Sequence, residues 1–362
     1  MRFDFNSRPF IIIWETTRAC SLACRHCRAS ADARRHPLEL STAEAFRLID
    51  QVVACQPALF VMTGGDPVRR EDLKELIRYA SYRGLRVGLT PSATPELLKE
   101  DFVVLKQCGV ARLALSLDGS TRASHDTFRG VPGTWDLTMT ALQRARAAQL
   151  PVQINTTFTR QNLHEFDAFV PLLRGIQPEL WSVFQLVPTG RGAQQDLLNA
   201  EEMETLFERL SQLSSEVDFD IKTTEGQHYR RVVLQQGGRA RGAGLRSPLG
   251  INDGKGFLFV SHIGSVLPSG FLPLSAGNIR IDNLLDLYRN HPLFRNLRNP
   301  EALQGKCGRC EFRTICGGSR ARAYAMTGDY LAEEPLCVYQ PKLRPDSTSQ
   351  FRCAAEQKPL GV

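Results

Sequence analysis

Seven of the ten cysteines in this chain fall into two groups near its opposite ends. The first group has the spacing C-x3-C-x2-C, and its members are Cys20, Cys24 and Cys27. The second group begins C-x2-C-x5-C and has one more cysteine further on; its members are Cys307, Cys310, Cys316 and Cys337. Three thiolates can hold three irons of a [4Fe–4S] cluster and leave the fourth iron open, whereas four thiolates can close a cluster. The first group therefore predicts an open iron–sulfur site.

A structural zinc ion is the alternative to a cluster in both groups. C-x3-C-x2-C without a nearby fourth ligand is not a usual zinc spacing. His26 could supply that ligand, although a residue between two ligands more often packs or hydrogen-bonds beside a cluster. Four thiolates can hold zinc as well as a closed cluster, so the second group leaves both interpretations open. Cys55 and Cys108 lie in apolar helical patterns and are expected in the core, and Cys353 lies near the C-terminus.

Short apolar runs alternate with amphipathic stretches from residue 9 to about residue 187. The predicted strands are Phe10–Trp14, Ala58–Met62, Leu85–Leu89, Arg112–Leu117, Val152–Thr157 and Leu180–Leu186. The predicted helices lie near 42–54, 70–82, 94–107, 133–148 and 163–174, with start signals at Ser41 and Thr94. Six such parallel βα units are too few to close an eight-stranded barrel. We therefore expect an α/β fold, an open (β/α)6 barrel whose chemistry lies at the carboxyl ends of its strands.

The rest of the chain predicts a helix, a linker and a small cysteine-rich unit. Residues 200–216 have a helical pattern, and Gln235–Gly250 is rich in Gly and Arg and has no periodicity. Phe257–Pro268 alternates around Gly264 and predicts a β-hairpin. We predict a barrel over residues 1–195, a bridging helix and linker over 196–250, a cluster-binding domain over 251–342 and a tail over 343–362.

The composition places limits on the class of protein. The 362 residues include 45 Lys and Arg against 38 Asp and Glu, a net charge of +7, and 42% are hydrophobic. This balance suits a folded core, and there is neither a run of ~18 apolar residues nor a signal peptide, so we expect a cytoplasmic protein that does not enter membranes. Disulfides are a poor default there. Basic residues do not interleave with aromatic ones, so nucleic acid is not an expected partner.

The first cysteine group and the next strand end together resemble the radical S-adenosylmethionine (SAM) superfamily. Met62-Thr63-Gly64-Gly65-Asp66-Pro67 is similar to the GGEP motif of that superfamily, with Asp in place of Glu. Leu115-Ser116-Leu117-Asp118-Gly119 and Asn155-Thr156-Thr157 match later strand ends. The resemblance implies that SAM is bound by Gly64, Gly65, Asp66, Ser116 and Asn155, with His26 beside the cluster. A turn or capping role remains open for each of these residues.

The resemblance implies a radical reaction. SAM would chelate the open iron, an electron from a donor such as flavodoxin or ferredoxin would break its sulfonium bond, and a 5′-deoxyadenosyl radical would abstract a substrate hydrogen. The second cysteine group is similar to the SPASM or twitch auxiliary-cluster domain, which favours a second [4Fe–4S] cluster over zinc. Ser269 and Arg320 stand where the full SPASM pattern has cysteines. We therefore expect two clusters, with roughly eight irons in total.

Several segments resemble the radical SAM enzymes of alternative haem and haem d1 synthesis. These segments are Val187–Gly192, Pro268–Leu274, Gly277–Arg280 and Cys316–Tyr324. Those enzymes modify carboxylate-bearing side chains of tetrapyrroles, by decarboxylation or by removal of the side chain. Arg191, Arg320 and Arg322 suit a polyanionic substrate, although they could equally cap helices or pair with Asp or Glu. The resemblance does not fix the substrate or the catalytic residues.

Two other functions remain possible on the sequence alone. A radical SAM maturase of a ribosomally made peptide is the main alternative, but such enzymes often carry a leader-binding domain, and only about eight residues precede the first predicted strand. A non-catalytic iron–sulfur carrier would explain neither Gly64-Gly65-Asp66-Pro67 nor the six βα units. The sequence therefore predicts an enzyme that acts on a tetrapyrrole, with a peptide as the second possibility.

Overall fold

A computed structural model describes residues 3–192, 197–237 and 250–342 of the chain. Its strands are β1 (Ile11–Glu15), β2 (Leu59–Thr63), β3 (Val87–Leu89), β4 (Val110–Ser116), β5 (Val152–Phe158), β6 (Leu180–Gln185), β7 (Asp220–Thr224), β8 (Phe257–Val260), β9 (Ser265–Leu267) and β10 (Gly277–Asn278). The first eight α-helices are α1 (Thr42–Cys55), α2 (Leu73–Tyr82), α3 (Pro95–Lys99), α4 (Phe102–Cys108), α5 (Arg122–Arg129), α6 (Thr134–Ala147), α7 (Phe166–Ile176) and α8 (Ala200–Leu213). The later ones are α9 (Tyr229–Gln235), α10 (Leu284–Asn290), α11 (Pro292–Arg298), α12 (Gly305–Arg309) and α13 (Arg320–Thr327).

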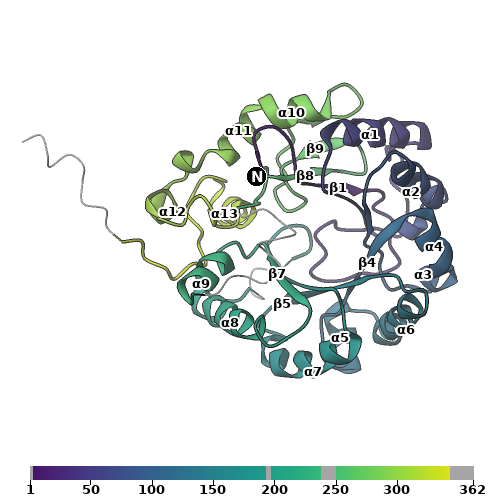
Figure 1. Cartoon of the computed structure of the whole chain (residues 1–362), viewed down its shortest axis with the longest axis horizontal. Helices are drawn as coiled ribbons and strands as arrows, with labels where there is room; N and C mark the ends of the chain where they lie inside the picture. The colour runs from purple at the N-terminus through teal and green to yellow at the C-terminus, as the bar shows by residue number, and fades with distance from the viewer. Residues whose placement is uncertain (1–2, 193–196, 238–249, 343–362) are drawn as a thin grey trace, which may run out of the picture.

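All ten described strands belong to one sheet, with the order β10-β9-β8-β1-β2-β3-β4-β5-β6-β7. The stretch from β8 to β7 is parallel throughout, and β9 and β10 add antiparallel strands beyond β8. Figure 1 shows this sheet curved at the centre, with helices such as α1, α2, α6 and α7 around its outer side. The barrel remains open because the two edge strands of the described sheet, β7 and β10, are not hydrogen-bonded to each other.

Alternation along the strands separates the two faces of the sheet. Ile12 and Trp14 of β1 and Trp181 of β6 are completely buried in the main core, against the helices. Their neighbours Ile11 and Ile13 are half-buried and face the other way, into the barrel. The helix-facing side therefore supplies the core, and the inner side is available for a site.

Local start signals place several of the helices. Ser41 accepts a hydrogen bond from the Glu44 N–H while Glu44 caps Ser41 in return, so α1 begins with a complete capping box. Asn199 and Glu202 do the same for α8. Thr94 caps α3 by accepting from the Leu97 N–H. These caps satisfy backbone N–H groups that a helix start would otherwise leave without partners.

The open (β/α) barrel and its six predicted strands are confirmed, with ends shifted by one or two residues. The single helix expected near 94–107 is wrong: Asp101 accepts from the Val103 and Val104 N–H groups and starts a second helix there, α4. The hairpin near 257–268 is confirmed as β8 and β9. The sequence did not indicate β7, α5 or the pairing of β8 with β1. Most of the Gly- and Arg-rich linker, the tail and Cys353 lie outside the described residues, and the domain boundaries stay predictions.

No helix in the described part of the chain is long and apolar enough to cross a membrane.

Candidate functional site

The first cysteine group lies on the loop that follows β1, at the carboxyl end of the parallel strands. Cys20 and Cys24 are buried and Cys27 is partly buried, and the three pack together with Leu22 and Ala31 in a small cluster separate from the main core. The Cys20 N–H donates to the Asp32 carbonyl at 2.7 Å, which closes the loop on itself. The chain therefore gathers the three thiols on one compact loop.

Gly64 and Gly65 hold this loop by backbone contact. The N–H groups of Gly65 and Asp66 donate to the carbonyls of Thr17 and Ala19, both at 2.7 Å. A Cβ at Gly65 would lie 2.5 Å from the Arg18 carbonyl oxygen, which no real side chain tolerates. The turn after β2 and the cysteine loop therefore fit together only with glycine here. The part of these glycines in SAM binding stays a prediction.

Asp66 is buried and makes hydrogen bonds within the protein. Its carboxylate accepts from the Thr94 hydroxyl at 2.8 Å and from the Ser92 N–H at 3.2 Å. Burial raises its pKa to about 6 in spite of these donors. The Ser92 hydroxyl lies 3.6 Å from the Cys20 sulfur. Asp66 therefore positions Ser92 beside the first cysteine of the loop.

His26 lies in a charged pocket next to the cysteines. Its Nε2 atom is 3.8 Å from the Asp118 carboxylate and 3.5 Å from the Arg129 guanidinium, and its ring packs against Phe128 at 4.6 Å between centroids. Burial, with Arg129 next, lowers the pKa of His26 to about 4, although Asp118 opposes the shift. The imidazole is therefore neutral near pH 7. Its predicted place beside a cluster is compatible with this geometry.

Ser116 and Asn155 are direct partners on the neighbouring strands β4 and β5. The Asn155 side-chain oxygen accepts from the Gln153 amide at 2.7 Å, on the same face of β5. Both side chains lie on the inner face, because Leu115 and Ile154 beside them are buried in the helix-facing core. The structure thus brings these two predicted SAM contacts together.

Arg191 holds the cysteine loop through its side chain and its backbone N–H, and its contact with a substrate carboxylate stays a prediction. Its side chain donates to the carbonyls of Cys24 at 3.0 Å and Ala31 at 2.8 Å, and its N–H donates to the Cys27 carbonyl at 3.0 Å. Gly190 before it has φ +61°, and a Cβ there would lie 2.2 Å from the Arg28 carbonyl oxygen. The segment after β6 therefore holds the loop after β1.

The four cysteines of the second group line one hollow. Its wall also includes His228, which precedes α9, and Arg231 of α9, together with Lys306, Phe312, Glu334 and Tyr339. Two of the thiol sulfurs already accept backbone N–H groups: Cys307 from Glu334 at 3.3 Å and Cys316 from Gly318 at 3.4 Å. Hydrogen bonds from backbone N–H groups to sulfur are typical of thiolates that hold a cluster.

Burial raises the pKa of the Cys316 thiol to about 12. Bound iron would offset this rise in pKa, because a metal ion deprotonates a thiol that coordinates it. Both ring nitrogens of His228 lack a protein partner and the residue is 1% exposed, so a neutral imidazole is available to donate toward the hollow. Burial, its largest cause, lowers the pKa of His228 to about 3. These surroundings suit a cluster that needs hydrogen-bond donors around its sulfurs.

Among the described residues, no three His, Cys, Asp or Glu side chains lie close enough to share one metal ion. A [4Fe–4S] cluster spreads its thiolates around a cube of iron and sulfide, whereas zinc draws four ligands to about 2.3 Å from one point. The four thiols around one hollow match the number of ligands that a closed cluster needs.

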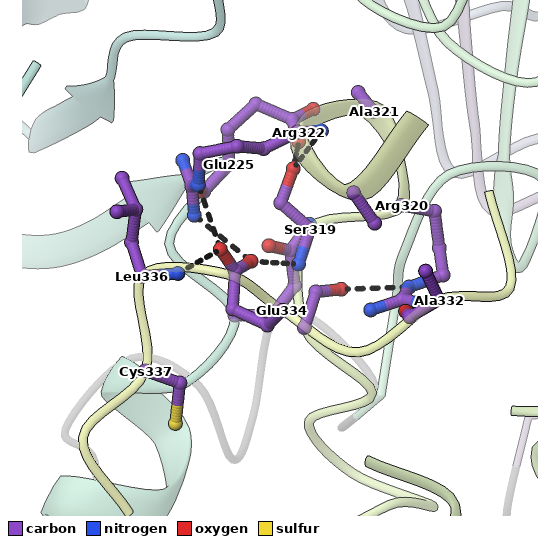
Figure 2. A network of polar contacts seen from close by, with 12 residues as sticks. Glu225, Ser319, Arg320, Ala321, Arg322, Ala332, Glu334, Leu336 and Cys337 are labelled. Atoms are coloured by element: carbon purple, nitrogen blue, oxygen red, sulfur yellow. Dashed lines mark hydrogen bonds and ion pairs between the residues drawn. The ribbon is translucent and has the colours of Figure 1, made fainter. Parts of the chain in front are cut away.

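A buried polar network supports the second hollow and occupies the other two arginines. Figure 2 shows Glu334 between Ser319 and Arg322, with Cys337 on the same segment as Glu334. Glu334 accepts from Arg322 Nε at 2.8 Å and from the Ser319 N–H at 2.7 Å. Arg320 donates to the carbonyls of Tyr330 and Ala332. Both arginines are 1% exposed or less, so their predicted contact with a substrate carboxylate is wrong.

The comparisons with known proteins agree with this geometry. A model of the radical SAM superfamily matches residues 14–173. The chain is 41% identical over 347 residues to the AdoMet-dependent heme synthase of Oleidesulfovibrio alaskensis, covering 92% of this chain and 88% of that protein. It is 39% identical to the AdoMet-dependent heme synthase of Methanosarcina barkeri, covering 92% and 97%. The crystal structure of Streptococcus suis SuiB bound to precursor peptide SuiA has a TM-score of 0.71 at 17% identity, covering 92% of this chain and 76% of that one.

An open parallel barrel with three cysteines on the loop after its first strand defines a radical SAM protein, and this chain belongs to the radical SAM superfamily. It is an enzyme whose cofactors are SAM, a [4Fe–4S] cluster and an auxiliary cluster. Within the superfamily it belongs with the AdoMet-dependent heme synthases.

Two residues of the second hollow had no signal in the sequence. His228, the N-cap of α9, and Arg231 of α9 belong to a helix too short to show a period, and tertiary contacts bring them to the hollow. Arg129, at the end of α5, lies in a segment that continues the motif of the Leu115–Gly119 strand end, and it pairs with Asp118 at 3.1 Å beside the first cysteine group.

Proposed function

We propose that this enzyme decarboxylates propionate side chains of an iron-containing tetrapyrrole, with iron coproporphyrin III as the substrate and haem as the product. The observation that carries the proposal is the 41% identity, over 92% of the chain, to an AdoMet-dependent heme synthase. Both cysteine groups fall within the described fold. The maturase relative MftC of Mycobacterium tuberculosis is 30% identical, so the higher identity to the heme synthase favours a tetrapyrrole.

The proposed ligands are Cys20, Cys24 and Cys27 for the SAM-binding cluster and Cys307, Cys310, Cys316 and Cys337 for the auxiliary cluster. When bound, these groups and SAM supply one-electron chemistry and a 5′-deoxyadenosyl radical. The protein itself fixes the geometry. Gly65 and Arg191 hold the cysteine loop from two sides, and the inner face of β4 and β5 presents Ser116 and Asn155 toward SAM.

The balance of the reaction requires an electron acceptor. Conversion of a propionate to a vinyl group removes one hydrogen atom, one carbon dioxide and one electron. A cluster held by the second cysteine group would be the redox centre that accepts this electron. The buried ion pair between Arg322 and Glu334 supports the segment that carries Cys337 and so suits a cluster in a fixed position. A flavodoxin or ferredoxin in the cytoplasm remains the predicted donor for SAM cleavage.

The test is anaerobic turnover of the reconstituted enzyme with SAM, dithionite and iron coproporphyrin III. Formation of 5′-deoxyadenosine together with loss of carboxyl groups, followed by mass spectrometry, supports the proposal. A Soret shift on mixing reports binding separately. If neither a Soret shift nor decarboxylation occurs while SAM is still cleaved, the tetrapyrrole is not the substrate, and a peptide becomes the function to test.

A further inference from the structure

Four polar side chains form one row across the inner face of the barrel. Ser116 of β4 is the register partner of Asn155 of β5, which pairs with Ser182 of β6, which pairs in turn with Lys222 of β7. The alternate residues Ile154, Val183 and Ile221 are buried in the helix-facing core. Because strand side chains alternate between faces, the row faces the inside of the barrel.

Lys222 is the charged member of this row. It makes no hydrogen bond or ion pair with the described residues, and its side chain remains accessible to solvent. Burial lowers its pKa to about 8, with a smaller contribution from Arg112. Arg112 lies on β4, three strands away, so the two cations interact across the barrel interior.

Within residues 3–192, 197–237 and 250–342, no carboxylate forms an ion pair with Lys222. Arg112 is committed to Glu179 at 3.5 Å and to Gln153. Asp220 lies on the same face of β7, one step toward the amino end, and does not contribute to the shift in Lys222. Ser182 and Thr224 bond to each other, 3.2 Å apart. An anion that enters here would pair with the Lys222 ammonium group, which is already partly desolvated.

The wall above the row is aromatic. Phe184 follows Ser182 on the same face of β6, and its ring lies 6.4 Å from that of Phe271. Phe271 and Phe259 also pack on the Arg28 guanidinium, which is itself paired with Glu15 at 3.2 Å. The inner face therefore combines apolar ring surface with the Lys222 ammonium group, which pairs with no carboxylate in the described part of the chain.

We propose that Lys222 is the residue that anchors a carboxylate inside the barrel, and that the carboxylate belongs to a side chain of the tetrapyrrole substrate. An apolar macrocycle would contact the phenylalanines while one propionate reaches the ammonium group. This inference rests on the proposed function. The carboxylate of SAM has the same chemistry, and the row also includes Ser116 and Asn155, so the experiment must separate these two sources.

The test measures binding to the anaerobic holoenzyme by Soret titration with iron coproporphyrin III and, separately, by equilibrium binding of SAM. For Lys222→Gln, we expect the Kd for the porphyrin to rise about tenfold to a hundredfold and the Kd for SAM to stay within about twofold. Lys222→Arg should restore most of the affinity. Lys74→Gln, which removes a surface pair with Glu100, is the matched control and should behave as wild type.

A porphyrin ester without free carboxylates sharpens the result, because it should bind the wild-type and Lys222→Gln enzymes equally. Equal binding of the free acid by both enzymes would overturn the role of Lys222 and leave the proposed function standing. If the wild type binds no iron coproporphyrin, the proposed function fails. In that case, weaker SAM binding by Lys222→Gln would show that Lys222 binds the carboxylate of SAM. Unchanged SAM binding would show that Lys222 binds no carboxylate.

Discussion

Arg322 and Glu334 form an ion pair that is sealed from solvent, with Nε 2.8 Å from Oε1 and side chains 0% and 1% exposed. Burial by itself would raise the pKa of Glu334, but Arg322, His228 and the Ser319 N–H together hold the pKa at about 2. The backbone N–H of the same glutamate donates to the Cys307 sulfur. One residue therefore connects the buried pair to a proposed ligand of the auxiliary cluster.

Glu334→Gln should lower the free energy of unfolding by about 3–5 kcal/mol, because it leaves the Arg322 charge buried without its partner. It should also lower the iron content of the second site. Chemical denaturation and iron analysis measure the two effects. The matched control is Glu301→Gln, which removes an exposed pair with Arg313 and should cost about 0–1 kcal/mol. Equal losses in the two variants would contradict this account.

Replacement of Cys20, Cys24 and Cys27 together with Ala should abolish formation of 5′-deoxyadenosine. Total iron should fall from roughly eight to roughly four per chain, since only the auxiliary cluster would remain. Chromatography of the nucleoside and iron analysis follow the result. Cys55→Ala, in the buried core of α1, serves as the control and should keep both. SAM cleavage that survives the triple change would refute the assignment.

Cys316→Ala should remove the auxiliary cluster and leave the first one. We expect half the iron, continued 5′-deoxyadenosine formation with dithionite, and loss of tetrapyrrole turnover. Anaerobic reconstitution followed by iron and sulfide analysis gives the count. A wild-type value near twelve irons would mean a third cluster, for which this chain lacks the cysteines that Ser269 and Arg320 replace.

Gly190→Ala should displace the cysteine loop, since the new Cβ would overlap the carbonyl oxygens of Cys27 and Arg28. Iron incorporation at the first site and SAM cleavage should both drop at least tenfold. Gly84→Ala is the control, because Gly84 also has a positive φ, +87°, but open space around its Cβ position. That variant should show only the backbone strain of about 1–2 kcal/mol. Similar iron contents in the two variants would rule out the clash.

The stability of the fold should decrease in mild acid, partly through His125. Its Nδ1 accepts the Asp118 N–H at 3.1 Å, which requires a neutral ring. Burial lowers its pKa to about 4; Arg129 adds to the shift, and Asp118 and Asp126 oppose it. The unfolded chain takes up the proton near pH ~6.5. The contribution of His125 is therefore fully present above that pH and is lost as the pH falls toward about 4.

His125→Asn should flatten the pH dependence of the free energy of unfolding between about pH 7 and pH 5, measured by urea denaturation. The exposed His164→Asn serves as the control and should leave the wild-type slope unchanged. A slope in His125→Asn as steep as in the wild type would show that other groups govern the acid response.

Local signals were sufficient for most of the barrel. The Ser41 and Thr94 caps and the six apolar runs each act over a few residues, so the sequence shows them directly. The strand β7 reads Asp-Ile-Lys-Thr-Thr and has no apolar run. It forms because β6 offers it a parallel edge. Without that strand, Lys222 could not be recognised as part of the inner row.

The site shows the same division between local and long-range information. The spacing of the cysteines predicted the two groups because cluster ligands lie close together in the chain. The arginines gave no such signal. Residue type alone cannot decide between a substrate carboxylate and a protein partner, and Arg191, Arg320 and Arg322 all bond to groups that folding brings to them.

The pairing of β8 with β1 makes the two ends of the chain depend on each other. Ile11 to Trp14 lie in register with Phe257 to Val260, so the strand that leads into the cysteine loop takes its second neighbour from the far end of the chain. A fragment that ended at residue 250 would leave β1 with an uncovered edge of apolar residues. Such an edge recruits strands from other molecules. During synthesis the barrel is therefore expected to rely on protection from aggregation until its last third has been made.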